Sequence, residues 1–431
     1  MKYVIIGGSA AGVNCAEVLR KNDKAAEITL ISDESFSLYS RSLLTYLIAG
    51  SIDEGKLYFK DESFYKDNKI KVYLGKKAVS IDARKKTITL EDKTEVSYDK
   101  LLLATGAEPK SVDIPGVDKQ GVFTLRKIDD ARKIIALLDR VKEIVVLGGG
   151  LIGLRDACAL RQRAKAVTVV VKSPQVLSQM VDVGAARMIS TVLEQNGIKI
   201  MTGVAAKEVL GGNSAEGILL DNGQKLNCQM VIVGKGVKAN TELALSSGLK
   251  VEEGIVVDEF LRTSDKDIFS AGDCAQTFDL ARGEKRINAL WPCAVEQGQI
   301  AALNMLGKKV TYIGSLSMNS VDFFGLGSIS IGITKPKNEK DYEIISKEVT
   351  GKSYKKFVLK EQRIVGVVLV GDINAAGVVG PLIKKRIDIS SIKHLLLKDS
   401  FNYATVIPLV AKYRECFKQQ EYKDTIISYK L

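Results

Sequence analysis

The sequence is poor in the residues that enzymes most often use for proton transfer and metal binding. Among its 431 residues there is a single histidine, His394, and no two of its six cysteines are close enough to form a CxxC pair. Local metal and thiol sites need such spacing, so we expect no zinc site, no cysteine-held iron–sulfur cluster and no local redox disulfide. A Ser-His-Asp triad is excluded unless His394 serves it. The chemistry is therefore expected to come from a bound cofactor.

Long hydrophobic runs are also missing. No apolar run approaches the roughly 18–20 residues that a membrane helix needs. The apolar N-terminus differs from a signal peptide, because Gly7 and Gly8 interrupt it and Glu17 and Arg20 follow at once. The widely separated cysteines fit a reducing compartment. We expect a cytoplasmic protein with no membrane partner.

Positive charge, in contrast, is in excess. The formal net charge is +12, which fits an acidic protein partner, nucleic acid or a membrane surface. The lysines are dispersed and no basic motif is interleaved with aromatic residues, so nucleic acid is the weakest of these partners. An ordinary solvated, lysine-rich surface is an equally good explanation of the charge.

One pattern occurs twice in the chain. Residues 3–12 and 144–153 each contain a short apolar run, a glycine turn and the start of a helical stretch, and strand-like runs follow at 28–31 and 167–171. In such a β-α-β unit the glycines allow a tight turn, a close approach of a pyrophosphate and close packing of the helix. Two copies in this context predict two dinucleotide-binding units with parallel strands. In the first copy Ser9 replaces the middle glycine, and its small side chain preserves the approach.

Other segments extend this pattern and then replace it. Apolar runs end in small residues at 101–106, 230–236 and 268–273, and a helix is predicted to run from the proline-containing turn near 291 to 306. From about residue 310 strands are predicted at 328–333 and 364–370, and residues 356–360 alternate as a half-exposed strand would. The lysine- and glutamate-rich stretch 335–363 is typical of exposed hairpins. Helical stretches follow, so we expect an α+β domain.

Together these motifs resemble the FAD-dependent pyridine nucleotide-disulfide oxidoreductase family. The likeness rests on both glycine turns, on Ala104-Thr105-Gly106 and on Ala271-Gly272-Asp273, and it covers essentially the whole chain. Residues 38–41, 291–298 and 315–320 resemble the NADH:rubredoxin/ferredoxin oxidoreductase branch. The resemblance implies an α/β fold with two nested Rossmann-like domains and a C-terminal α+β domain. Residues 1–112 and 241–310 would bind FAD, 113–240 would bind NAD(P), and 311–431 would form the C-terminal domain.

The resemblance also implies roles for individual residues. The first glycine turn would hold the FAD pyrophosphate, Glu34 the adenosine ribose and Asp273 the ribityl chain. The helix near 291–306 would direct its N-terminus at the flavin. The expected FAD-binding residues are Gly7, Ser9, Ala10, Gly12, Glu34, Arg41, Ser42, Val79, Ala104, Thr105, Gly106, Gly272, Asp273 and Ala294. The expected NAD(P)-binding residues are Gly148, Gly150, Ile152, Gly153, Lys172 and Gly236.

At one informative position the sequence departs from the family pattern. Oxidases and coenzyme A disulfide reductases of the family carry a cysteine near residue 42, where this chain has Ser42. A serine forms neither a mixed disulfide nor a sulfenic acid. Cys15 is not expected to substitute, because its side of the first helix packs on the sheet. What remains is electron transfer directly through the flavin, with no side chain predicted to be catalytic.

The choice of nicotinamide cofactor is open. NADH enzymes usually carry an acidic residue where strand 167–171 ends, and it binds the ribose 2′-hydroxyl. Here the strand ends in Val171, followed by Lys172, and a lysine pairs well with the 2′-phosphate of NADPH. A surface lysine beside an undiscriminating site explains the pattern equally well, and the NADH-using branch argues the other way. Many relatives also carry glutamate at the position of Arg155, near the nicotinamide.

The expected function is FAD-dependent electron transfer between NADH or NADPH and a small acidic carrier protein. A ferredoxin, an iron–sulfur subunit or a rubredoxin would suit, and the direction of transfer is open. Two alternatives stand beside it: an NAD(P)H oxidase that makes hydrogen peroxide, and an electron-transfer subunit of a larger complex associated with carbon-monoxide dehydrogenase or hydrogenase. Ser42 disfavours a disulfide or persulfide reductase. By family analogy, a homodimer would form through the C-terminal domain.

Overall fold

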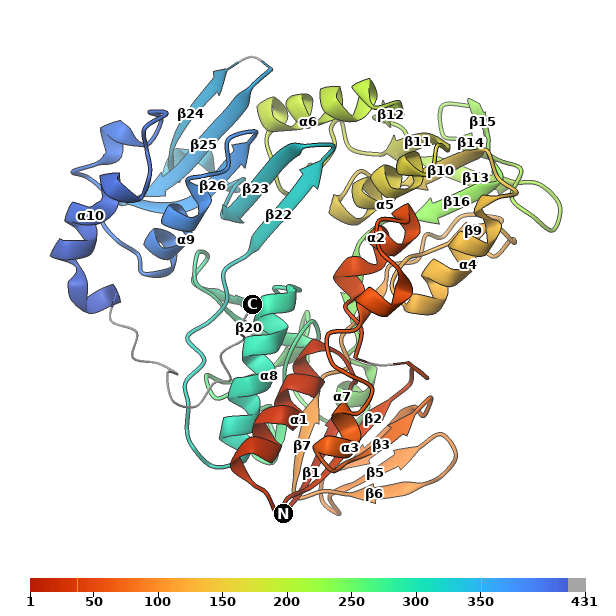
Figure 1. The fold of residues 1–431 in the computed structure, drawn as a ribbon, viewed down its shortest axis with the longest axis vertical. Coiled ribbons are helices and arrows are strands. Elements are labelled where there is room, and N and C mark those ends of the chain that lie inside the picture. Colours follow the sequence, from red (N-terminus) through yellow and green to blue (C-terminus); the bar gives the residue numbers. More distant parts are fainter. Residues whose placement is uncertain (37, 350, 418–431) are drawn as a thin grey trace.

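A computed structural model describes residues 1–36, 38–349 and 351–417. Two five-stranded parallel sheets and one five-stranded antiparallel sheet occupy three regions of the molecule (Figure 1). The predicted α/β class with two Rossmann-like units is confirmed. None of the described helices is long and apolar enough to cross a membrane.

The first parallel sheet contains the N-terminal glycine-turn unit. Its elements are β1 (Lys2–Ile6), β2 (Glu27–Ser32), β3 (Ile70–Leu74), β7 (Lys100–Leu103), β19 (Ile268–Ser270), α1 (Ala10–Asn22), α8 (Trp291–Met305), β4 (Ala78–Asp82), β5 (Thr87–Leu90) and β6 (Glu95–Ser97). The strand order is β19-β7-β1-β2-β3. Helices α1 and α8 cover the face that carries Ile5 and Leu102, and β4–β6 cover the face that carries Val4 and Leu101. Burial on both faces explains the continuous apolar runs.

The second parallel sheet repeats this plan with the second glycine turn. Its elements are β9 (Val122–Phe123), β10 (Glu143–Leu147), β11 (Ala166–Val171), β12 (Ile198–Thr202), β16 (Met230–Val233), α4 (Ile128–Leu138), α5 (Leu151–Gln162), α6 (Val183–Gln195), β13 (Ala206–Leu210), β14 (Gly217–Leu220) and β15 (Lys225–Asn227). The strand order is β12-β11-β10-β16-β9. Helices cover one face and β13–β15 the other.

Shorter elements lie outside the large sheets. They are α2 (Leu44–Ala49), α3 (Phe64–Asp67), β8 (Ala107–Pro109), β17 (Val237–Ala239), α7 (Glu242–Ser246), β18 (Ile255–Val256), β20 (Ala275–Asp279) and β21 (Glu284–Arg286). Strands β8 and β17 pair antiparallel, next to the predicted domain boundaries at 112 and 240. The boundaries themselves stay a prediction.

The C-terminal region is an antiparallel sheet with helices on one face. Its elements are β22 (Met318–Phe323), β23 (Leu326–Gly332), β24 (Glu343–Val349), β25 (Ser353–Lys360), β26 (Arg363–Val370), α9 (Ala376–Lys384) and α10 (Tyr403–Lys412). The order is β22-β23-β26-β25-β24. Helices α9 and α10 pack on one face, and α6 of the second unit lies beside the other (Figure 1). The strands predicted at 328–333 and 364–370 are confirmed.

Strand β25 differs from its prediction. Residues 356–360 alternate in polarity, yet β25 is buried on both faces from residue 354 to 359. Lys355 and Lys356 are only 3% and 4% exposed. Their ammonium groups meet Asp372 at 2.7 Å and Asp182 at 2.8 Å, which offsets the cost of burial. The expected exposed hairpin over 335–363 therefore holds for β24 and is wrong for β25.

Helices α1 and α8 cross closer than a side chain would permit. A Cβ atom on Gly298 of α8 would lie 2.1 Å from the carbonyl oxygen of Ala11 in α1. Glycine at this position lets the two helices pack backbone against backbone. The crossing lies at the start of α1 and at the middle of α8.

Gly298→Ala should destabilise the protein by about 1–3 kcal/mol or more, because the added methyl group forces α8 away from α1. Gly377 is the matched control, since it lies inside α9 and an added Cβ would meet open space. Gly377→Ala should be neutral or slightly stabilising. Thermal unfolding followed by circular dichroism measures both variants, and equal melting temperatures would contradict the tight crossing.

Candidate functional site

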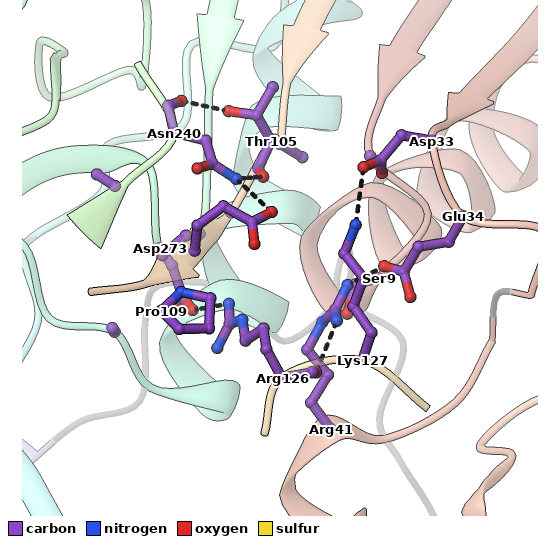
Figure 2. Close-up of a pocket in the computed structure, with 18 of the residues that line it drawn as sticks. Ser9, Asp33, Glu34, Arg41, Thr105, Pro109, Arg126, Lys127, Asn240 and Asp273 are labelled. Atoms are coloured by element: carbon purple, nitrogen blue, oxygen red, sulfur yellow. Dashed lines mark hydrogen bonds and ion pairs between the residues drawn. The ribbon is translucent and has the colours of Figure 1, made fainter. Parts of the chain in front are cut away.

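A cavity of about 1150 Å³ lies between the first parallel sheet and the start of α5. The turns after β1, β2, β7 and β19 all contribute to its wall, because the carboxyl ends of parallel strands meet at one edge of a sheet. Figure 2 shows the polar side chains that converge on it. The predicted residues that line the cavity are Gly7, Ser9, Ala10, Glu34, Arg41, Ser42, Val79, Ala104, Thr105, Gly106, Ile152, Gly272, Asp273 and Ala294.

The other predicted residues do not line this cavity. They are Gly12, Gly148, Gly150, Gly153, Lys172 and Gly236. Gly12 directly follows Ala11, which lines the cavity, and it packs against the first glycine turn. The remaining five follow β10, β11 and β16 at the carboxyl edge of the second sheet. The predicted residues thus lie at the edges of two different sheets, and Ile152, which was predicted with the second set, lines the cavity at the edge of the first sheet.

Both glycine turns are built in the same way. Gly7 has a φ of 122°, and a Cβ atom there would lie 2.1 Å from the carbonyl oxygen of Ala104. A Cβ atom on Gly12 would lie 1.9 Å from the carbonyl oxygen of the turn itself. The second turn has equivalent contacts of 2.3 Å at Gly148 and 2.2 Å at Gly153. Glycine is therefore required by close backbone approach in both copies.

Two neighbours fix Glu34 in the cavity wall. The Tyr39 hydroxyl donates a hydrogen bond to Glu34 Oε2 at 2.5 Å, and Arg41 forms an ion pair with Oε1. Arg41 also donates to the carbonyl oxygen of Arg126 at 3.0 Å. Burial raises the pKa of Tyr39, so this hydroxyl stays a proton donor. Glu34 and Arg41, predicted separately, form one ordered cluster.

Several wall residues were missed by sequence reasoning. Arg126 pairs with Asp273 at 2.9 Å across 147 residues of sequence, and its Nε atom is buried without a hydrogen-bond partner. Lys127 pairs with Asp33 at 3.0 Å (Figure 2). No motif marks either basic residue. Only Asp33, adjacent to the predicted Glu34, carried a local signal.

The two chain segments that connect the two units are also bonded to each other beside the cavity. Thr105 Oγ1 donates to the carbonyl oxygen of Asn240 at 2.7 Å, and Asn240 Nδ2 donates to the carbonyl oxygen of Thr105 at 3.0 Å. Asn240 directly follows β17, so this reciprocal pair extends the β8–β17 ladder. Thr105 was predicted and Asn240 was not. Asn240 follows the apolar run 230–236, which resembles the run 101–106 that contains Thr105.

Around Ser42 the chain presents arginine and hydroxyl groups. Arg155 Nη2 donates to the carbonyl oxygen of Ser42 at 3.1 Å and to Thr45 Oγ1 at 2.8 Å. Its guanidinium carbon lies 5.3 Å from the centre of the Tyr46 ring. No cysteine in the described part of the chain lines the cavity. Cys15 is fully buried in α1, as predicted.

Asp156 is the unexpected group in the wall. It is 2% exposed, and neither carboxyl oxygen has a hydrogen-bond partner. Burial raises the pKa of Asp156 to about 8, and the neighbouring charge of Arg155 opposes this rise only in part. The carboxyl group is therefore mostly protonated at neutral pH.

The wall fits FAD. Helix α1 begins there, and its N-cap residue Ser9 makes no side-chain capping bond, so its hydroxyl is available to a phosphate. The unpartnered Arg126 Nε offers a further donor. Helix α8 also begins at the wall. The ring of its first residue, Trp291, packs edge-on against Phe59, with 5.2 Å between the ring centroids. Among the described residues no cluster of three or more acidic, cysteine or histidine side chains is suited to a metal ion.

Comparison with known families identifies the class of this protein. Residues 1–298 match the family described as pyridine nucleotide-disulphide oxidoreductase, and residues 318–387 match the rubredoxin NAD+ reductase C-terminal domain. The first match covers more than half of the chain, which therefore belongs to this family of FAD-dependent oxidoreductases. The resemblance predicted from the two glycine turns is confirmed.

Individual relatives cover most of the chain. It is 31% identical over 395 residues to the NADH-dependent phenylglyoxylate dehydrogenase subunit epsilon of Aromatoleum evansii, covering 91% of this chain and 93% of that protein. It is 36% identical over 310 residues to the rubredoxin-NAD(+) reductase of Pseudomonas putida, covering 71% and 80%. A solved NAD-dependent persulfide reductase from A. fulgidus has a TM-score of 0.87 at 27% identity, covering 96% and 84%. The covalent putidaredoxin reductase–putidaredoxin complex gives 0.87 at 26%, covering 96% and 99%.

Asp156→Asn should stabilise the protein, and the gain should grow as pH rises from about 5 to about 8. Because folding raises the pKa of Asp156, the folded chain binds this proton more tightly than the unfolded chain, and its stability falls through that window. The amide has no charge to bury, so the gain above pH 8 should be on the order of a few kcal/mol. Melting temperatures across the pH range measure it. Asp139→Asn, at an exposed aspartate, should follow the wild type, and parallel profiles for Asp156→Asn and wild type would refute the buried acid.

Proposed function

We propose that this protein binds FAD in the cavity, binds NADH or NADPH at the second glycine turn, and passes electrons between the nicotinamide and a small iron–sulfur or rubredoxin-type carrier protein. The observation that carries the proposal is the cavity wall, which joins the first glycine turn to the start of α5 and contains no cysteine among its described residues. The relative named rubredoxin-NAD(+) reductase and the match of the C-terminal domain support this kind of carrier.

The chain's own residues would bind and orient both groups. Ser9 and the first turn of α1 would hold the FAD pyrophosphate, Glu34 the adenosine ribose and Asp273 the ribityl chain. The start of α8 would place the positive end of a helix dipole near the flavin and favour its negatively charged form. When bound, FAD supplies the capacity to take a hydride from a nicotinamide and to release electrons singly.

Ser42 argues against chemistry at a protein sulfur. It lines the cavity where thiol-using members of the family carry cysteine. Cys15 is inaccessible, and burial raises the pKa of its thiol. A buried, protonated thiol is a poor nucleophile. We therefore do not propose disulfide or persulfide reduction through a cysteine of this chain.

A second candidate is the same electron transfer carried out as a subunit of a larger complex. The relative named subunit epsilon of a phenylglyoxylate dehydrogenase matches 91% of this chain, which supports that arrangement. Copurification from native cells separates the two: a free enzyme emerges without an iron–sulfur protein bound to it, and a subunit emerges with one.

Anaerobic NADH or NADPH should bleach the flavin absorbance of the FAD-loaded protein, and an acidic ferredoxin or rubredoxin should restore it faster than air does. The carrier's rate constant should fall about tenfold or more between roughly 50 and 500 mM salt, because screening weakens attraction to the +12 surface. An uncharged quinone is the control and should show no such slope. Faster reoxidation by air would indicate a peroxide-forming oxidase, and absence of bleaching with both nucleotides would refute the proposal.

Two lysines at the edge of the second sheet bear on the choice of nucleotide. Lys172 follows β11 and Lys235 follows β16. Partial desolvation and the charge of Lys172 lower the pKa of Lys235, so the two cations lie close enough to repel. An anion between them would relieve this repulsion. We propose that they accept the 2′-phosphate of NADPH, so that NADPH is a substrate of this protein.

Lys172→Glu should raise the half-saturating NADPH concentration for flavin reduction about tenfold or more while changing that for NADH about twofold at most, because only NADPH carries the 2′-phosphate. Lys199→Glu, an exposed lysine at the start of β12, is the matched control and should leave both values unchanged. A strong preference of the wild type for NADH, or equal effects of Lys172→Glu on both nucleotides, would rule out this use of Lys172.

A further inference from the structure

The C-terminal domain touches the segment that follows Lys172. Residues 172–182 connect β11 to α6, and three polar contacts reach them from the C-terminal domain. Lys356 Nζ lies 2.8 Å from Asp182 Oδ2, and the Tyr354 hydroxyl donates to the same oxygen at 2.7 Å. Lys335 Nζ donates to the carbonyl oxygen of Ser178 at 2.8 Å. Figure 1 shows α6 beside the sheet, whose strand β25 carries Tyr354 and Lys356.

Asp182 is held firmly by these contacts. The Lys356 side chain is 5% exposed and that of Asp182 25%, so water competes little for the pair. Asp182 Oδ1 also caps α6 by accepting from the Ala185 amide at 3.3 Å. Burial alone would raise the pKa of Asp182, but the hydrogen bonds from Lys356 and Tyr354 outweigh it and the pKa lies below its ordinary value. The carboxylate is charged and fully engaged.

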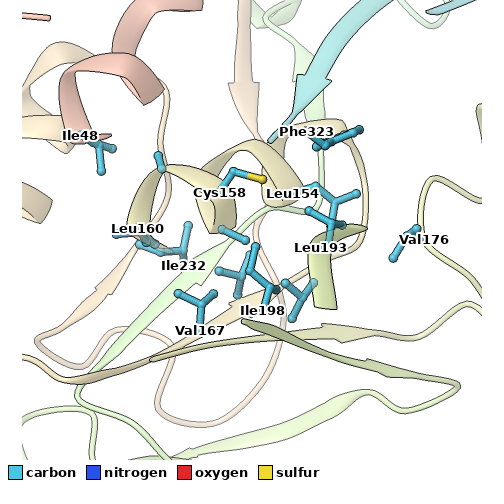
Figure 3. Packing of buried hydrophobic residues seen from close by; sticks show 14 of the residues in the cluster. Ile48, Leu154, Cys158, Leu160, Val167, Val176, Leu193, Ile198, Ile232 and Phe323 are labelled. Atoms are coloured by element: carbon cyan, nitrogen blue, oxygen red, sulfur yellow. The ribbon is translucent and has the colours of Figure 1, made fainter. Parts of the chain in front are cut away.

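Apolar side chains also pack between the C-terminal domain and the second unit. A Cβ atom on Gly184, two residues into the α6 region, would lie 2.7 Å from the Tyr354 ring, so the ring rests directly on the helix backbone. Phe323 of β22 is fully buried beside α5, near Leu154 and Cys158 (Figure 3). The C-terminal sheet therefore shares a core with the helices that follow the second glycine turn.

From Asp182 the contact continues to the glycine turn itself. Gln175 Nε2 donates to the carbonyl oxygen of Val181 at 2.9 Å, which folds the segment back on itself. Leu177, with a φ of 49°, donates its amide to the carbonyl oxygen of Gly149 at 2.7 Å. The middle of the Gly148–Gly150 turn is thus bonded to a segment whose far end the C-terminal domain holds.

We propose that Tyr354 and Lys356 of the C-terminal domain are positioning residues for nicotinamide-nucleotide binding: they hold Asp182, and through it residues 172–182, in the shape that receives the nucleotide. This inference rests on the proposed function of the second glycine turn. It assigns the C-terminal domain a role in the nucleotide site of its own chain. Loss of the contact should weaken nucleotide binding and leave the limiting rate of flavin reduction nearly unchanged.

Lys355 provides a matched control. It is the neighbouring residue on β25, its side chain is 4% exposed, and its ammonium group pairs with Asp372 at 2.7 Å. Asp372 belongs to the C-terminal domain, so this pair does not reach residues 172–182. Lys355→Met and Lys356→Met each remove one buried ammonium group that pairs with an aspartate. The two variants differ in the aspartate that loses its partner: Asp372 lies within the C-terminal domain, and Asp182 ends the segment 172–182.

The test uses the full-length, FAD-loaded protein and follows anaerobic flavin bleaching against NADH and NADPH concentration. Lys356→Met should raise the half-saturating concentration about tenfold or more with the limiting rate within about twofold of wild type, and Lys356→Arg should recover most of the loss. Lys355→Met should lower the melting temperature about as much as Lys356→Met does, but its half-saturating nucleotide concentrations should equal those of the wild type. Equal half-saturation values for Lys355→Met and Lys356→Met would overturn the inference.

Tyr354→Phe keeps the test decisive if Lys356→Met fails to fold. It removes one hydrogen bond and no charge, so it should raise the half-saturating concentration about threefold or more. An unchanged value in a folded Tyr354→Phe would overturn the inference. Wild-type protein that neither nucleotide bleaches would instead overturn the proposed function, so the two failures are distinguishable.

Discussion

Backbone contact at a few glycines is the constraint on which the rest of the structure depends. Gly7 lets the turn after β1 meet the turn after β7, Gly12 lets α1 meet its own turn, and Gly298 lets α8 meet α1. Because of these contacts, two helix N-termini and the ends of four parallel strands converge on one cavity. A side chain at any of these glycines would push the elements apart, and their free N–H groups and dipoles would lose a common target.

Local patterns made much of this fold predictable, and distant pairings made the rest unpredictable. Glycine spacing and apolar runs predicted both dinucleotide-binding units, the helix near 291–306 and the C-terminal α+β domain, and the structure confirms them. Arg126 meets Asp273, and Lys356 meets Asp182, only after distant segments have folded together, so neither pairing leaves a local trace. Nothing in the sequence of α5 indicates that Asp156 is buried. The cofactor-binding roles of single residues stay predictions, since the structure tests only their placement.

The polar groups of the cavity are mostly neutralised in pairs that the fold holds in place. Glu34 with Arg41 and Asp273 with Arg126 join elements from different parts of the chain. Dipoles and charges fixed in this way need little reorganisation when charge moves, which is how a protein assists a cofactor that carries its own chemistry. Asp156 differs from these residues. Its carboxyl group has no hydrogen-bond partner, and burial raises its pKa, so it keeps its proton. The wall thus avoids an unpaired buried charge both by pairing and by protonation.

The attachment of the C-terminal domain shows how polar groups fix a contact that apolar packing leaves adjustable. Phe323 and Tyr354 bury apolar surface against α5 and α6, and hydrophobic attraction has no preferred direction, so packing alone tolerates small shifts. A buried ion pair, in contrast, resists such shifts. Lys356 displaced from Asp182 would be an uncompensated charge away from water, so one placement of the domain is favoured over its neighbours. The same ion pair holds Asp182, and with it one end of residues 172–182, whose Leu177 bonds to the second glycine turn. The proposed role of the C-terminal domain follows from this one chain of contacts.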